Sequence, residues 1–122
     1  MLFVDVETTG LHSRDHIVSY GGILADMAGI ETGTMNLNIE HLIFDPGVKS
    51  HPEAEKVHGY SDWLLRHQDQ FPAHAAEVAE QIAKADLVVA HNADFDIRFL
   101  RGSCKIPPDS RRSSSHHCAH WA

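Results

Sequence analysis

Hydrophobic and polar positions along the first third of the chain follow the pattern of β-strands. Residues 2–6 form a short apolar run rich in β-branched side chains, which predicts a buried strand. A second strand is expected over residues 16–25, where Gly21-Gly22 marks a bulge or a close backbone approach. A third is expected over residues 35–44, whose alternation indicates a half-buried strand near a sheet edge. The short links between the three strands favour an antiparallel meander.

After the third strand the period becomes helical. Short helical pieces are expected at residues 53–58 and 61–67, and a longer helix with an apolar stripe at residues 72–85. Residues 86–90 predict a fourth strand, wholly apolar after its first residue and therefore central, and a helix follows at residues 94–101. The order β-β-β-α-β-α is that of a mixed α/β sheet.

Beyond this helix the sequence shows neither the alternation of a strand nor the period of a helix. Residues 102–122 contain two adjacent prolines, an Arg-Arg-Ser-Ser-Ser run and a His-rich end, so we expect an irregular tail after one domain at residues 1–101. Both cysteines lie in this tail and make no disulfide framework, which fits a reducing compartment. No apolar run reaches the length of a membrane span, and a cytoplasmic location without membrane contact is expected.

The charge balance narrows the choice of partners. A formal net charge of -7 argues against a protein that coats nucleic acid through a basic surface. The negative charge does not argue against a nuclease, because bound cations reverse the sign of the charge that a substrate meets.

Acidic residues at two of the predicted elements suggest a metal site. Asp5 and Glu7 are two residues apart on the first strand, so both side chains point to one face, where two carboxylates repel each other unless a cation lies between them. Asp96 stands in the first turns of the helix after the fourth strand. If the first and fourth strands are parallel neighbours, the three carboxylates converge on divalent metals, which suggests phosphodiester hydrolysis. The alternative for Asp5 and Glu7 is that they lie on an exposed edge strand and are simply solvated.

Two segments carry a family resemblance. Asp5-Val6-Glu7-Thr8-Thr9-Gly10 and His91-Asn92-Ala93-Asp94-Phe95-Asp96 resemble the first two motifs of the DnaQ-like (DEDDh) 3′–5′ exonucleases, above all those that proofread for bacterial DNA polymerase III. The resemblance covers about residues 1–101 and includes the segment Val57-His58-Gly59. It implies a ribonuclease H-like sheet in the order 3-2-1-4-5, of which we expect the first four strands here and the fifth to be missing.

The resemblance also implies roles for individual residues. Asp5, Glu7 and Asp96 are the implied catalytic carboxylates and ligands of two Mg²⁺ or Mn²⁺ ions. The implied substrate is a single-stranded 3′ end of DNA or RNA, and a DNA polymerase subunit is an implied partner. The implied substrate-binding residues are Thr8, Thr9, Gly10, Leu11, Asn92 and Phe95.

The third motif of the family, His or Tyr followed by four residues and Asp, has no match, since no acid lies beyond Asp109. The general base is therefore unknown, and its loss typically slows a reaction by about 10²–10⁴-fold. An open fourth strand is expected to invite self-association through its edge. Alternatives are a non-catalytic metal- or nucleotide-binding module, a base supplied by His117 or His120, and a zinc site in the tail.

Overall fold

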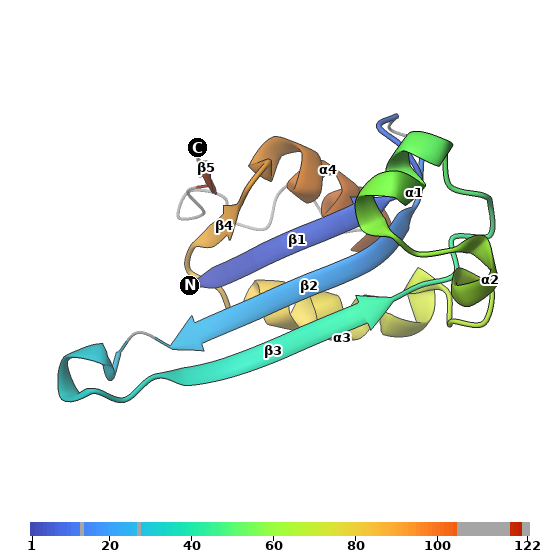
Figure 1. Ribbon diagram of the computed structural model, residues 1–122. Helices are drawn as coiled ribbons and strands as arrows, with labels where there is room; N and C mark the ends of the chain where they lie inside the picture. Colours follow the sequence, from blue (N-terminus) through green and yellow to red (C-terminus); the bar gives the residue numbers. More distant parts are fainter. Residues whose placement is uncertain (13, 27, 105–117, 121–122) are drawn as a thin grey trace.

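The computed structural model describes residues 1–12, 14–26, 28–104 and 118–120, which build one sheet with helices beside it (Figure 1). The elements in chain order are β1 (Leu2–Thr8), β2 (Ile17–Asp26), the 3-10 helix η1 (Ile30–Thr32), β3 (Asn36–Ile43), α1 (Pro52–His58), α2 (Asp62–Leu65), α3 (Phe71–Ala83), β4 (Val88–Ala90), α4 (Ala93–Cys104) and β5 (Cys118–His120). Within these described residues, no helix is both long enough and apolar enough to cross a membrane.

The sheet is mixed, with the strand order β3-β2-β1-β4-β5. β1, β2 and β3 form the predicted antiparallel meander, because their links are short. β4 returns through α1, α2 and α3 and lies parallel to β1, with Val4 opposite Ala90. The predicted order of the first four strands is therefore confirmed.

The prediction that a fifth strand is missing was wrong. β5 pairs in parallel with β4, and Val88 lies opposite Cys118. β4 is buried at each of its three positions, and its outer backbone groups find partners in β5. The basis for the predicted self-association, an open β4 edge, is therefore absent over these residues.

The segment predicted as an irregular tail is only partly described. α4 continues to Cys104, three residues past the expected end at residue 101, and β5 lies further along the same segment. Residues 105–117 and 121–122 of the predicted tail lie outside the described residues. His117, one of the two histidines predicted above as a possible base, is among them.

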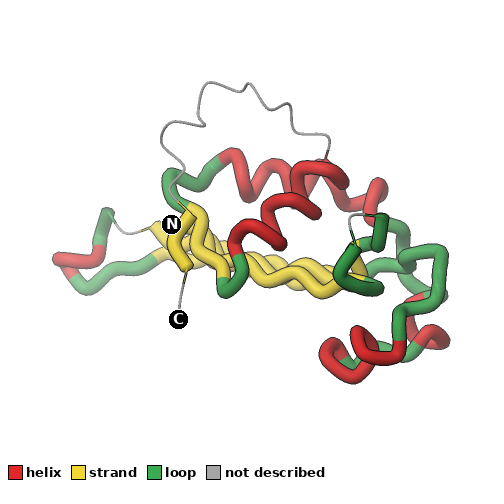
Figure 2. Tube along the Cα trace, turned by 90° about the horizontal axis from the view of Figure 1, so that it is seen from above, coloured by secondary structure: helices red, strands yellow, loops and turns green. Residues whose placement is uncertain are grey.

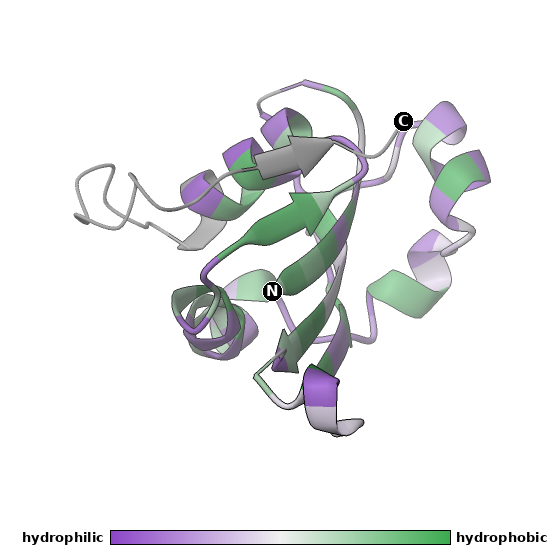
Figure 3. Cartoon of the chain, turned by 90° about the vertical axis from the view of Figure 1, so that its left-hand side faces the viewer, coloured by the Kyte–Doolittle hydropathy of each residue, from purple (hydrophilic) through white to green (hydrophobic). Residues whose placement is uncertain are grey.

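α3 and α4 cover one face of the sheet, as the views from the front and from above show together (Figures 1 and 2). Apolar colour follows the central strands and the helix sides that meet them (Figure 3). The core cluster joins β1 to both helices and to the chain after β3; its larger members are Leu2, Val4, Val6, Tyr20, Phe44, Phe71, Val78, Phe99 and Leu100.

A buried polar network fixes α3 to this face. The Tyr20 hydroxyl donates to Oε1 of Gln81 at 2.6 Å, and Nε2 of Gln81 donates to the carbonyls of Gly22 at 3.2 Å and Asn38 at 3.1 Å. A Cβ at Gly22 would lie 2.0 Å from Oε1 of Gln81, so only glycine fits there. This is the close approach that the Gly-Gly pair predicted.

Candidate active site

The first two acids lie on the face of β1 that turns away from α3 and α4. Val4 and Val6 are buried on the covered face, whereas Asp5 is exposed and Glu7 is half-buried on the other. β4 ends level with Val4, and α4 begins three residues later at Ala93. The first turn of α4 therefore lies beside the carboxyl half of β1, as parallel pairing of the two strands requires.

Asp96, in that first turn, is the most perturbed acid of the site. Its side chain is buried, and the residue is only 4% exposed. Burial above all, and then the negative charges of Asp5 and Glu7, raise the pKa of Asp96 to about 7. Burial and the charge of Asp5 also raise the pKa of Glu7. The charge of Asp5 is thus close enough to oppose the ionisation of both Glu7 and Asp96, and the charge of Glu7 to oppose that of Asp96.

The chemistry of this set fits a divalent cation. Mg²⁺ and Mn²⁺ prefer carboxylate oxygens, and a cation would remove the repulsion that raises the pKa values of Asp96 and Glu7. In the part of the chain that the structure describes, however, no group of three or more His, Cys, Asp or Glu side chains is arranged to hold a metal ion. The acids are therefore electrostatic neighbours that do not form such a group in this structure.

A pocket of about 460 Å³ opens beside Glu7. One wall is the end of β1 with the loop after it, the other is α1 with the residue before it, and Phe95 of α4 closes the space between them. The lining residues are Val6, Glu7, Thr8, Gly10, Leu11, His12, His51, Glu53, Ala54, Val57 and Phe95. Apolar walls next to a carboxylate suit a nucleobase whose phosphate points toward the acids.

Four of the predicted substrate-binding residues, Thr8, Gly10, Leu11 and Phe95, line this pocket. Leu11 is 80% exposed, so its side chain is available for contact. Asn92 is not among the lining residues, although its carbonyl accepts a hydrogen bond from the Asp96 amide at 3.0 Å. Asn92 therefore shapes the start of α4.

Thr9 lies behind the pocket wall. It is fully buried, and its hydroxyl donates to Oδ1 of Asp15 at 3.2 Å and accepts from the His16 amide at 3.0 Å. Its carbonyl accepts from the His51 amide at 2.8 Å. Thr9 thus fixes the backbone of the loop and is not itself a lining residue.

Most of the lining residues that the sequence did not indicate belong to the second wall. Glu53 and Ala54 reach the pocket from α1, and His51 comes from the residue before that helix. They carry no motif of their own, because their role depends on where α1 lies against β1. Val57, from the segment that shares the family resemblance, lines the same wall.

His58 fixes the end of α1. Its Nδ1 accepts a hydrogen bond from the Tyr60 amide at 2.9 Å, its Nε2 lies 3.1 Å from the Ser50 hydroxyl, and its ring stacks on Tyr60. Burial lowers the pKa of His58, against the opposing charges of Glu55 and Asp62. The neutral ring is the form that can accept from Tyr60, so His58 holds the α1 wall in place through the Val57-His58-Gly59 segment.

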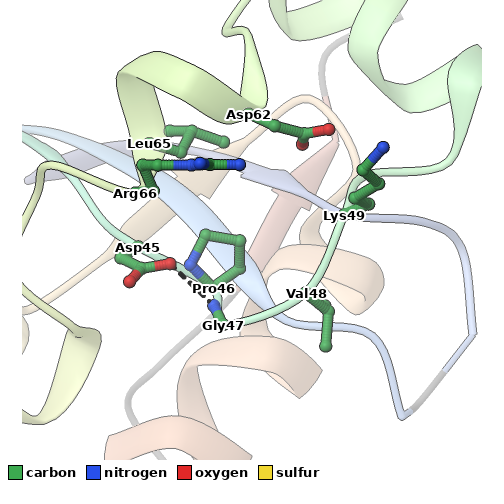
Figure 4. A pocket seen from close by; sticks show the side chains of 8 residues that line it. All are labelled: Asp45, Pro46, Gly47, Val48, Lys49, Asp62, Leu65 and Arg66. Carbon is green, nitrogen blue, oxygen red and sulfur yellow. Dashed lines mark hydrogen bonds between the residues drawn. The ribbon is translucent and has the colours of Figure 1, made fainter.

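A second pocket, of about 290 Å³, lies between the loop that follows β3 and α2 (Figure 4). The basic groups of Lys49 and Arg66 face the same space as the carboxylate of Asp62, and Asp45 also lines it. Asp45 accepts a hydrogen bond from the Gly47 amide at 2.9 Å. Because charges of both signs line this pocket, it offers neither a metal ligand set nor a basic surface.

Comparison with known proteins defines the class. The RNase T model, described as exonuclease, matches residues 2–106, and the chain belongs to this exonuclease family.

Two curated relatives carry the name DNA polymerase III subunit epsilon. The one from Treponema pallidum (strain Nichols) is 32% identical over 112 residues, which cover 88% of this chain and 49% of the relative. The one from Escherichia coli (strain K12) is 33% identical over 101 residues, which cover 81% of this chain and 41% of the relative. The chain spans about half the length, or less, of the relatives it matches.

The fold has a solved counterpart. Exonuclease I of E. coli in complex with a dT13 oligonucleotide matches 98% of this chain and 27% of its own, with a TM-score of 0.75 and 21% identity. This likeness, with the family match, confirms the predicted ribonuclease H-like mixed sheet with flanking helices.

Proposed function

We propose that this chain carries the catalytic carboxylates of a metal-dependent 3′–5′ exonuclease that hydrolyses 3′-terminal nucleotides of DNA or RNA. The observation that carries the proposal is the burial of Asp96 beside Asp5 and Glu7, together with the pocket that Glu7 lines. Membership of the exonuclease family supports the reaction class.

In this proposal Asp5, Glu7 and Asp96 hold two Mg²⁺ or Mn²⁺ ions. Bound there, the ions supply stabilisation of the attacking and leaving oxygens of the phosphodiester. The chain's own residues bind and orient the strand. Leu11 and Phe95 offer apolar surface to the terminal base, the backbone at Thr8 and Gly10 faces its sugar, and Thr9 fixes this loop from behind. Burial of Asp96 makes its carboxylate costly without a cation, which couples metal binding to ionisation.

The partner and the location are proposed from the relatives. Two of them are named as a subunit of DNA polymerase III, so we propose a DNA polymerase as partner and the cytoplasm as the place of work. The solved exonuclease I is in complex with a DNA oligonucleotide, dT13, which supports a single-stranded 3′ end as substrate.

The test is hydrolysis of a 5′-labelled single strand of DNA and of RNA with Mg²⁺ or Mn²⁺. We expect shortening from the 3′ end that requires the metal and that Asp5→Asn abolishes. The matched control is Asp86→Asn, because Asp86 is an exposed acid at the opposite end of β4. Activity that survives Asp5→Asn, or that Asp86→Asn removes equally, would refute the site assignment.

The second candidate is a module that binds metal and nucleotide without cleaving. The three acids and the pocket beside Glu7 account for binding alone, and this candidate needs no general base. Calorimetry with Mn²⁺ and a nucleoside monophosphate separates the two. Binding without any cleavage selects the module, and cleavage selects the exonuclease.

A further inference from the structure

His51 links the two pocket walls directly, through its backbone and through its side chain. Its amide donates to the Thr9 carbonyl at 2.8 Å, which joins the residue before α1 to the loop after β1. Its Nε2 lies 3.5 Å from Oδ1 of Asp15, within ion-pair distance. The side chain of His51 is 63% exposed, so burial alone does not hold it in this position.

Asp15 is a fixed acceptor for this contact. Its Oδ2 accepts from the His12 amide at 2.8 Å and its Oδ1 from the Thr9 hydroxyl at 3.2 Å. Burial alone would raise the pKa of Asp15, but these hydrogen bonds and the nearby His51 lower it. The carboxylate is therefore ionised, and it lies within ion-pair distance of Nε2 of His51.

The pair closes over Gly10. A Cβ at that position would lie 2.4 Å from Cδ2 of His51 and 2.5 Å from Oδ2 of Asp15. The edge of the imidazole thus packs directly on the backbone of a pocket-lining residue. The ring, the carboxylate and the glycine form one contact between the walls.

We propose that His51, held by Asp15, is a positioning residue that sets the width of the pocket for the 3′-terminal nucleotide. It fixes α1, with Val57, against the loop that carries Leu11, so the terminal base meets a pocket of constant width. This inference rests on the proposed function. It predicts an effect on substrate affinity and none on the metal site, because neither partner is a neighbour of Asp96.

Two substitutions of His51 distinguish the contact with Asp15 from the presence of the imidazole ring. In His51→Gln the amide nitrogen can occupy the place of Nε2 and still donate to Asp15, whereas in His51→Asn it reaches only as far as Nδ1. Binding is measured by fluorescence of a single strand whose 3′-terminal base is aminopurine, with Ca²⁺ present. We expect affinity about fivefold weaker for His51→Asn and within about twofold of the native chain for His51→Gln.

The control is Lys84→Gln, which removes an exposed ion pair to Glu80 of α3 at 3.0 Å and involves neither pocket wall. It is expected to leave affinity unchanged. Mn²⁺ affinity is expected to be equal in all variants. Equal affinity of the Gln and Asn variants for the strand, or loss of Mn²⁺ binding with His51→Asn, overturns the inference.

A separate measurement keeps the inference distinct from the proposed function. Hydrogen exchange of the His12 amide, which donates to Asp15, is expected to be faster in His51→Asn than in His51→Gln, with no substrate present. If the native chain binds no 3′ end, the proposed function fails, while this exchange difference still reports whether His51 restrains the loop. No difference in exchange overturns the restraint itself.

Discussion

Replacing Asp96 with asparagine removes a carboxylate whose ionisation is unfavourable in the folded chain. Asp96 is 4% exposed, and burial beside Asp5 and Glu7 raises its pKa to about 7 from an ordinary value of 3.8. The folded chain therefore keeps a proton on Asp96 that the unfolded chain releases at much lower pH. The free energy of unfolding must then fall as pH rises from about 4 to 7, and the full cost remains above pH 7.

The magnitude follows from the shift. The shift of about three pKa units at Asp96 corresponds to at most about 4 kcal/mol of lost stability. An asparagine amide still costs part of this when it is buried, so we expect Asp96→Asn to raise the free energy of unfolding by about 2 kcal/mol at pH 8. Near pH 4, where the native carboxyl is neutral, the difference should nearly vanish.

Urea unfolding of the two chains at pH 4, 6 and 8, without divalent ions, measures this difference. Asp86→Asn is the matched control and should stay within about 0.5 kcal/mol of the native chain at each pH. Added Mn²⁺ should stabilise the native chain and leave Asp96→Asn almost unchanged. An Asp96→Asn chain that is equally or less stable at pH 8 would refute the proposed repulsion.

Three further substitutions test the fold and the pocket wall by urea unfolding. Gly22→Ala forces a Cβ against Gln81 and should cost about 1–3 kcal/mol; a neutral result would contradict the packing of α3. Phe44→Ala empties a fully buried site and should cost about 3–5 kcal/mol, and a loss below about 1 kcal/mol would contradict its core position. Since burial lowers the pKa of His58 from 6.5, stability should fall as pH drops below about 6.5, and His58→Gln should flatten this dependence; an unchanged slope would contradict it.

Local pattern and topology were enough to predict the centre of the molecule. The apolar runs at β1 and β4 and the short links of the meander give the order of four strands, and parallel pairing of β1 with β4 brings Asp96 toward Asp5 and Glu7. Period-2 spacing alone puts the two β1 acids on one face.

The rest depends on packing that no local pattern encodes. The alternation of side chains in β3 shows which residues share a face of the strand, but it does not show whether another element covers that face. Leu37 is in fact 53% exposed and Ile39 is 63% exposed. β5 has three residues, too few for a recognisable period. His51 and Asp15 are 36 positions apart and meet only because α1 packs beside the end of β1.

Manganese binding, followed by the electron paramagnetic resonance signal of free Mn²⁺, tests most directly whether the three acids form a metal site. We expect the native chain at pH 8 to remove Mn²⁺ from solution. Asp96→Asn and Asp5→Asn should each weaken this binding by at least about tenfold, while Asp86→Asn should not. Equal uptake by the native chain and Asp96→Asn, or no uptake by the native chain, would contradict it.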